Sequence, residues 1–110
     1  MDINIKIILK DKPNLLANAN VSINTIELGF VTIKNFVIWR STYFNERLQE
    51  AINIEPPKTQ GFRRTPIVFF ETRDKWFDLE RQIYDAFNVS RAGKEEIDID
   101  EVDAGIEASK

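Results

Sequence analysis

The side chains best suited to chemistry in this sequence are basic and gather around a turn in the middle of the chain. The stretch from Ile52 to Phe70 has apolar, strand-like ends, whereas its middle, EPPKTQGFRRT, is polar and basic. Six basic side chains lie between residues 34 and 64, against three acidic ones: Lys34, Arg40, Arg47, Lys58, Arg63 and Arg64. A guanidinium can donate two parallel hydrogen bonds to phosphate, and Phe62 among these charges is of a type that stacks on unpaired bases. The pattern predicts contacts with nucleic acid.

The same stretch also has a purely structural interpretation. Gly61 can form a hairpin turn that Lys58 and Arg63 solvate, while Phe62 packs on its own hairpin. The pair Pro56-Pro57 lacks amide donors and protects the edge of a sheet from further pairing. Charge pattern by itself favours this solvated hairpin, so both interpretations remain open at this point.

Little in the sequence points to catalysis or to a metal. There is no His and no Cys, which removes the commonest general base and the commonest zinc ligands. The four Gly are far apart, so no phosphate-binding loop is present. Glu50 and Glu55 are better explained as solvated strand residues, and the acidic run EEIDIDEVD lacks the spacing of a calcium-binding loop. We therefore expect no catalytic residue, no cofactor and no metal site.

Length and charge predict one small domain with an acidic tail. The chain has 110 residues, and no apolar run approaches the roughly 18 residues that a membrane span needs. Residues 1–90 carry a net charge of +1, whereas residues 91–110 carry −4. We expect a folded domain over 1–90 and a disordered acidic tail over 91–110. The absence of Cys and of an N-terminal signal favours a soluble, cytoplasmic protein that does not enter a membrane.

Hydrophobic spacing predicts an α+β fold. Alternation from Leu16 to Ile26, with Ala17, Ala19 and Val21 on one face, is typical of a half-buried antiparallel strand. Further strands are expected at Ile3–Leu9, Phe30–Trp39, Ile52–Ile54 and Ile67–Phe70. Thr72 is a suitable N-cap for an amphipathic helix that reaches Phe87. The expected architecture is a small, mostly antiparallel sheet of about five strands with a C-terminal helix on one face.

The segment WRSTYFNER, which follows the third predicted strand, is unusually aromatic for a loop. Trp39 and Phe44 could cover the end of the sheet and so belong to the core. Alternatively, Trp39, Tyr43 and Phe44 form an interface with a second copy of the chain, because aromatic residues and Arg are enriched at such contacts. So short a chain has few places to bury eight Phe, two Trp and two Tyr, which favours a homodimer interface.

Several motifs, taken in order, resemble the stage V sporulation protein G (SpoVG) family. Its members carry an alternating A-x-A-x-V/I strand, a central strand like FVVKDIRVID, a proline followed by a basic loop, an F/Y-R strand, and a helix that opens with Thr-Arg. The matching positions are Ala17, Ala19 and Val21, then residues 30–38, Pro57-Lys58, Phe62-Arg63 to Phe70, and Thr72-Arg73 to Phe87. The resemblance covers residues 3–88.

This resemblance implies a function as well as a fold. It implies a small sheet with a C-terminal helix, dimerisation by strand pairing, and binding of DNA, and of RNA in some members, by a regulator of gene expression, septation or sporulation. Carried over by position, phosphate binding falls to Lys58, Arg63 and Arg64. Lys34, Arg40 and Arg47 would flank these contacts, and Phe62 would stack on a base. The alternative is a non-catalytic protein-interaction dimer that binds no nucleic acid.

Overall fold

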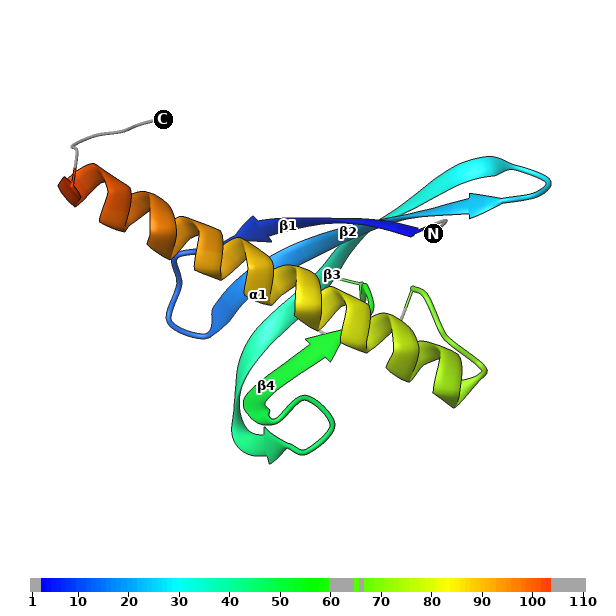
Figure 1. The fold of residues 1–110 in the computed structure, drawn as a ribbon. Helices are drawn as coiled ribbons and strands as arrows, with labels where there is room; N and C mark the ends of the chain where they lie inside the picture. Colours follow the sequence, from blue (N-terminus) through cyan, green and yellow to red (C-terminus); the bar gives the residue numbers. More distant parts are fainter. Residues whose placement is uncertain (1–2, 60–64, 66, 104–110) are drawn as a thin grey trace.

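The computed structural model describes residues 3–59, 65 and 67–103, with side chains up to residue 93. It is an α+β fold in which an antiparallel sheet of four strands, in the order β1-β2-β3-β4, precedes one helix (Figure 1). The elements are β1 (Ile3–Leu9), β2 (Leu15–Thr25), β3 (Gly29–Asn45), β4 (Glu50–Glu55) and α1 (Arg73–Asp103). Consecutive strands are neighbours, so the sheet is a meander that needs only short connections.

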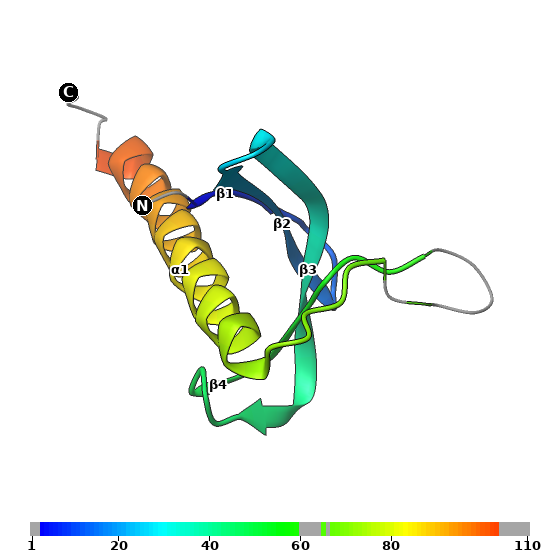
Figure 2. The ribbon, with the colours of Figure 1, turned by 90° about the vertical axis from the view of Figure 1, so that its right-hand side faces the viewer.

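One face of the sheet packs against α1 and forms the core (Figure 2). Ala17, Ala19 and Val21 of β2 are fully buried there, as the alternation in the sequence predicts. Phe36 and Ile38 of β3 are buried beside them. The remaining buried hydrophobic residues come from the turn before β4, from β4 itself and from α1: Leu48, Ile52, Ile54, Leu79, Ile83, Tyr84 and Phe87.

The predicted fifth strand is wrong. Residues 67–70 form no strand, although the chain there pairs locally with the segment that follows β4. The Thr59 amide donates to the Thr65 carbonyl at 2.8 Å, and the Ile67 amide donates to the Pro57 carbonyl at 2.9 Å. Pro56 and Pro57 have no amide hydrogen, so a regular ladder cannot continue through them. The result is a short paired segment outside the sheet.

Strand β3 is longer than the predicted strand and contains a bulge. It continues to Asn45, so most of the segment expected to be a loop is strand. Val21 pairs with Ile33 while Ala19 pairs with Phe36, which leaves an extra residue on β3. Asn35 at this point has φ of 71°. The bulge lets both Ile33 and Phe36 pair with buried β2 residues and contact the core, which strict alternation does not allow.

Helix α1 begins where the sequence predicts but ends later. The amides of Lys75 and Trp76 both donate to the Thr72 carbonyl at 3.1 Å, as expected when Thr72 is the N-cap residue. The helix then runs to Asp103 and so continues past residue 90, where the sequence predicts that the folded domain ends. Arg91, which contacts Glu50 of β4, holds the helix against the sheet beyond residue 90. Residues 104–110 lie outside the described residues.

Candidate nucleic-acid interface

The face of the sheet that α1 does not cover is polar. Pairing across the strands places amides and hydroxyls in rows there, because paired residues point to the same side. Ser22 Oγ and Thr32 Oγ1 are 2.7 Å apart, and Asn20 Oδ1 accepts a hydrogen bond from the Asn35 amide at 3.2 Å. We call this surface the open face, and its side chains come from Asn4, Lys6, Ile8, Asn18, Asn20, Ser22, Thr32, Lys34, Asn35, Val37, Trp39, Asn53 and Glu55.

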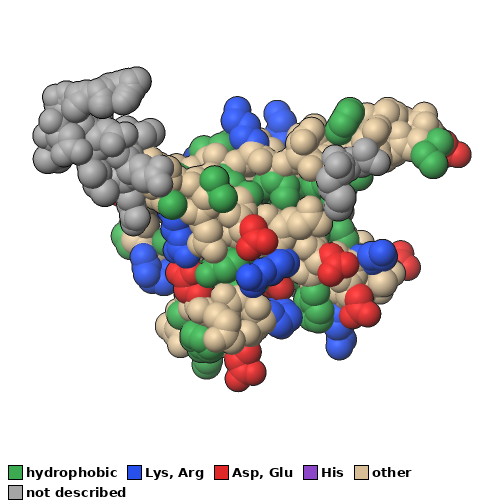
Figure 3. Space-filling model, viewed as in Figure 1, with side chains coloured by type: hydrophobic (Ala, Val, Ile, Leu, Met, Phe, Trp, Pro, Cys, Tyr) green, Lys and Arg blue, Asp and Glu red, His purple; other side chains and the backbone are tan. Residues whose placement is uncertain are grey.

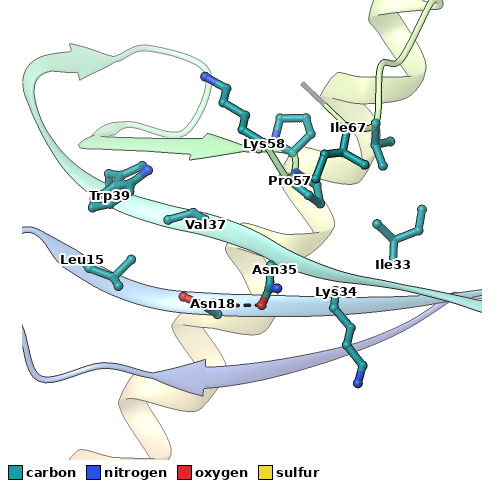
Figure 4. Close-up of a pocket in the computed structure, with 12 residues that line it drawn as sticks. Leu15, Asn18, Ile33, Lys34, Asn35, Val37, Trp39, Pro57, Lys58 and Ile67 are labelled. Atoms are coloured by element: carbon teal, nitrogen blue, oxygen red, sulfur yellow. Dashed lines mark hydrogen bonds between the residues drawn. The ribbon is translucent and has the colours of Figure 1, made fainter. Parts of the chain in front are cut away.

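A groove of about 680 Å³ lies on the open face, and we call it the open-face groove (Figure 4). Strands β2 and β3 form its floor, and the paired segment after β4 forms its wall. Figure 4 shows Trp39 toward one end of the groove and Ile33 toward the other. The lining residues are Leu15, Asn18, Ile33, Lys34, Asn35, Val37, Trp39, Pro56, Pro57, Lys58, Ile67 and Val68. Pro57 is buried and Val68 is half-buried, and both line the groove.

An unsatisfied acceptor lies at the floor of this groove. Asn18 Nδ2 donates to Asn35 Oδ1 at 3.4 Å. Asn18 Oδ1 is buried and accepts no hydrogen bond from any described residue. Buried polar atoms in folded proteins nearly always have a partner, so an isolated acceptor calls for an explanation.

Positive charge predominates on the open face. Lys6 and Lys34 are exposed there, and Lys58 Nζ lies 3.5 Å from Glu55 Oε1. Of the two acidic residues in the strands, Glu50 and Glu55, only Glu55 lies on this face. By contrast, acidic and basic side chains are intermixed on the helix-covered side (Figure 3).

Two of the predicted phosphate ligands lie on the opposite side of the sheet. Arg40 pairs in register with buried Ile52, and its Nε donates to the Pro13 carbonyl at 3.2 Å. Arg47 donates two hydrogen bonds of 3.0 Å to the carboxylate of Glu80 on α1. This contact raises the pKa of Arg47 above its ordinary value. Lys34 and Lys58 therefore both line the open-face groove, where their side chains point in different directions (Figure 4), whereas Arg40 and Arg47 do not line it.

The other predicted site residues fall into two groups. Phe62, Arg63 and Arg64 lie outside the described residues. Of the aromatic residues predicted for a dimer interface, Trp39 is half-buried and lines the open-face groove, whereas Tyr43 is 81% exposed and Phe44 is also exposed. Trp39 therefore lines the open-face groove, whereas neither Tyr43 nor Phe44 does.

Sequence reasoning did not single out two features of these surfaces. Asn18 and Lys6 carry no distinguishing signal in the sequence, because amides and single lysines on an alternating strand are usually solvated. The tip of the β2–β3 hairpin exposes Ile26, Leu28 and Phe30, and hydrophobic side chains are visible at the right-hand end of Figure 3. The apolar residues on either side of Gly29 were the available signal for this second surface.

A polar cluster joins α1 to β4 on the helix-covered side of the sheet. Glu50 Oε1 accepts hydrogen bonds from Tyr84 Oη at 2.6 Å and from Arg91 Nη2 at 2.7 Å, while Oε2 accepts from Arg91 Nη1 at 3.0 Å. Arg91 also contacts Asn88. The hydrogen bonds from Arg91, and then that from Tyr84, hold the pKa of Glu50 below its ordinary value. This cluster has the character of a structural contact between helix and sheet.

Comparisons with known proteins assign no family. No protein-family model matches the chain, and it matches neither a curated protein nor a solved structure. The part of the chain that the structure describes contains no helix long and apolar enough to cross a membrane. Within the same residues, no group of three or more His, Cys, Asp or Glu side chains is arranged to hold a metal ion.

Proposed function

We propose that this chain is a SpoVG-like regulatory protein that binds nucleic acid, DNA or RNA, across the open face and acts as a cytoplasmic homodimer. The observation that carries the proposal is the polarity of this face. Three basic side chains, those of Lys6, Lys34 and Lys58, project from a surface of amides and hydroxyls. Among the described strands, Glu55 is the single carboxylate on this face. Such a surface offers both point charges for phosphate and neutral partners for bases.

The location of the basic segment also supports this function. Lys58 lines the open-face groove, and Phe62, Arg63 and Arg64 follow it within six residues of the chain. An antiparallel sheet followed by a C-terminal helix is also the fold that the SpoVG resemblance implies. Arg40 and Arg47 are not part of the proposed interface, because Arg40 pairs with buried Ile52 of β4 and Arg47 binds Glu80 of α1.

The homodimer is proposed from exposed apolar side chains. Leu28 at the tip of the β2–β3 hairpin is 77% exposed, with Ile26 and Phe30 beside it, and Tyr43 and Phe44 are exposed at the far end of β3. Contiguous apolar groups on a protein surface mark interaction sites. Replacement of Leu28 by Lys should shift the protein to monomer in analytical ultracentrifugation, while Val89→Lys, on the exposed side of α1, should leave the dimer intact. A monomeric wild type would exclude the homodimer.

Nucleic-acid binding is tested by a salt series. The wild type, a K6A/K34A/K58A variant and a Lys75→Ala control would be titrated with labelled duplex and single-stranded oligonucleotides between 50 and 300 mM salt. Each lost phosphate contact should reduce the slope of log K against log salt by about 0.9 on duplex DNA and about 0.7 on single strands. Lys75 lies on α1, away from the open face, so its replacement should leave the slope unchanged.

A second candidate function, that of a protein-interaction dimer, is favoured by the apolar hairpin tip alone. It predicts that the wild type forms a dimer but binds no oligonucleotide even at the lowest salt. That combination of results would reject the nucleic-acid proposal. Circular dichroism of the triple-lysine variant would show that any lost binding does not come from unfolding.

A further inference from the structure

The open-face groove has the size and the lining of a site for one unpaired nucleotide. Its volume, about 680 Å³, falls within the range of small-ligand pockets. It is bounded on one side by the wall that carries Pro57 and Lys58, so an occupant must enter between this wall and the floor (Figure 4). In a duplex the faces of the bases are covered by stacking, whereas an unpaired base can turn into such a groove.

Asn18 restricts the chemistry of the occupant. Its Oδ1 is a buried acceptor with no partner among the described residues, so it needs a hydrogen-bond donor. The oxygens of an ionised phosphate cannot donate, whereas the amino and imino groups of nucleobases can. Oδ1 exposes almost no surface in this structure, so an occupant reaches it after the Asn18 side chain rotates. A single long hydrogen bond among the described residues, 3.4 Å from Nδ2 to Asn35 Oδ1, opposes that rotation.

The other lining groups match the remaining parts of a nucleotide. Val37, Pro57 and Ile67 offer apolar surface for the face of a base, and Trp39 adds an aromatic ring toward one end. Lys34 and Lys58 also line the groove and supply positive charge for the adjoining phosphates. Among the described residues Lys58 is paired with one carboxylate, Glu55, at 3.5 Å, a contact that a phosphate can replace.

We propose that the open-face groove binds a single unpaired base, with Asn18 Oδ1 accepting a hydrogen bond from its amino or imino group and with Lys34 and Lys58 holding the flanking phosphates. This inference rests on the proposed nucleic-acid function and deepens it. It makes the protein selective for single-stranded or looped nucleic acid over a continuous duplex. An apolar side chain of a protein partner is the competing occupant, and it would leave Asn18 Oδ1 without a donor.

The test uses the fluorescence of Trp39. A Trp76→Phe variant keeps an aromatic ring beside Phe36 and Phe70, and it leaves Trp39 as the only indole. This variant would be titrated with eight-nucleotide single strands of each base, with a blunt duplex of the same length, and with free mononucleotides, at equal phosphate concentration. We expect single strands to quench Trp39 and to bind more tightly than the duplex. Quenching by mononucleotides at millimolar concentration would show that the base alone enters the groove.

An Asn18→Leu replacement in the same background removes the acceptor at nearly constant volume. It should weaken single-strand binding by about three- to tenfold, the value of one lost hydrogen bond, and leave duplex binding unchanged. Gln82→Leu on α1 is the matched control and should change neither single-strand binding nor duplex binding. Thermal unfolding of both variants would show whether they are folded.

The outcomes separate this inference from the proposed function. Equal affinity for single strands and duplex, with no quenching of Trp39, would overturn the groove proposal and leave the nucleic-acid function standing. Unchanged single-strand affinity in folded Asn18→Leu would overturn the role of Asn18. Failure of the wild type to bind any nucleic acid at low salt would reject the proposed function and this inference together.

Discussion

Glu80 is the one charged side chain that is buried among the described residues, and Arg47 supplies its counter-charge. The carboxylate is 2% exposed and receives both hydrogen bonds from the guanidinium, which also lies 4.2 Å from the centre of the Phe77 ring. A carboxylate removed from water needs such a partner, because its desolvation is otherwise uncompensated. Arg47 therefore has a structural function that joins the β3–β4 turn to α1.

Replacing Arg47 by Ala should lower the free energy of unfolding by about 1–3 kcal/mol, because Glu80 then keeps a buried charge without donors. Urea denaturation measures the loss. Arg81→Ala, which breaks an exposed ion pair with Asp85, is the control and should cost only about 0–1 kcal/mol. A double R47M/E80M variant should regain part of the loss. An Arg47→Ala variant no less stable than Arg81→Ala would contradict this account.

Glu50 should make stability depend on pH in the acid range. Its pKa is lower in the folded protein than in the unfolded chain, chiefly because of Arg91, so its contribution is fully present above the unfolded pKa, about 4.3. That contribution is lost as the pH falls through the lower, folded pKa. The wild type should therefore lose more stability than Glu50→Gln between pH 5 and pH 3 in urea unfolding. Parallel losses in the two proteins would show that Glu50 has no such effect.

The bulge in β3 sets the faces of the central strands. Asn35 adopts a left-handed conformation, which a β-branched residue adopts only with strain. Replacement of Asn35 by Val should lower the free energy of unfolding by about 1–2 kcal/mol, while Asn35→Gly should be far milder. Lys34→Val, one residue earlier in the same strand, serves as the control for adding an apolar side chain. Equal stability of Asn35→Val and Asn35→Gly would mean that the backbone at this point is not strained.

Local patterns in the sequence were sufficient to predict the elements whose hydrophobic periodicity is simple. Strand β1 matches its predicted bounds, β2 differs from its prediction by one residue at each end, and α1 begins after Thr72 as expected. The bulge at Asn35 and the extension of β3 to Asn45 depend on pairing with β2 and β4, which alternation along one strand does not encode. The prediction of a fifth strand was wrong because residues 56 and 57 are prolines, which interrupt the hydrogen-bond ladder of the sheet.

The candidate site was predictable only in part, because the assignment of a charge to a face depends on register. Lys34 and Lys58 both line the open-face groove, but Arg40 and Arg47 come from the same basic stretch and lie across the sheet. Asn18 is one of several amides on β2, and only its position opposite Asn35 distinguishes it. Phe62, Arg63 and Arg64 remain predictions.

The boundary between the folded domain and the acidic tail, placed after residue 90 by the sequence, stays a prediction. Arg91 still contacts β4, whereas residues 94–110 carry two lysines against seven carboxylates, a net charge of −5. A chain of residues 1–93 should therefore unfold at the wild-type temperature, while one of residues 1–89 should be less stable. If the acidic residues compete with phosphate for the basic segment, the 1–93 chain should also bind nucleic acid more tightly. Unchanged affinity of the 1–93 chain for nucleic acid would show that the acidic residues do not compete with phosphate.

The most direct test of the central claim is a nuclear magnetic resonance titration of the ¹⁵N-labelled protein with a short single-stranded oligonucleotide at low salt. Binding at the open face predicts shifts in the side-chain amides of Asn18 and Asn35 and in the indole NH of Trp39. The backbone amides of Asp85 and Val89, on the exposed side of α1, should stay unchanged. Shifts confined to α1, or no shifts at saturating oligonucleotide, would contradict the assignment of the open face as a nucleic-acid interface.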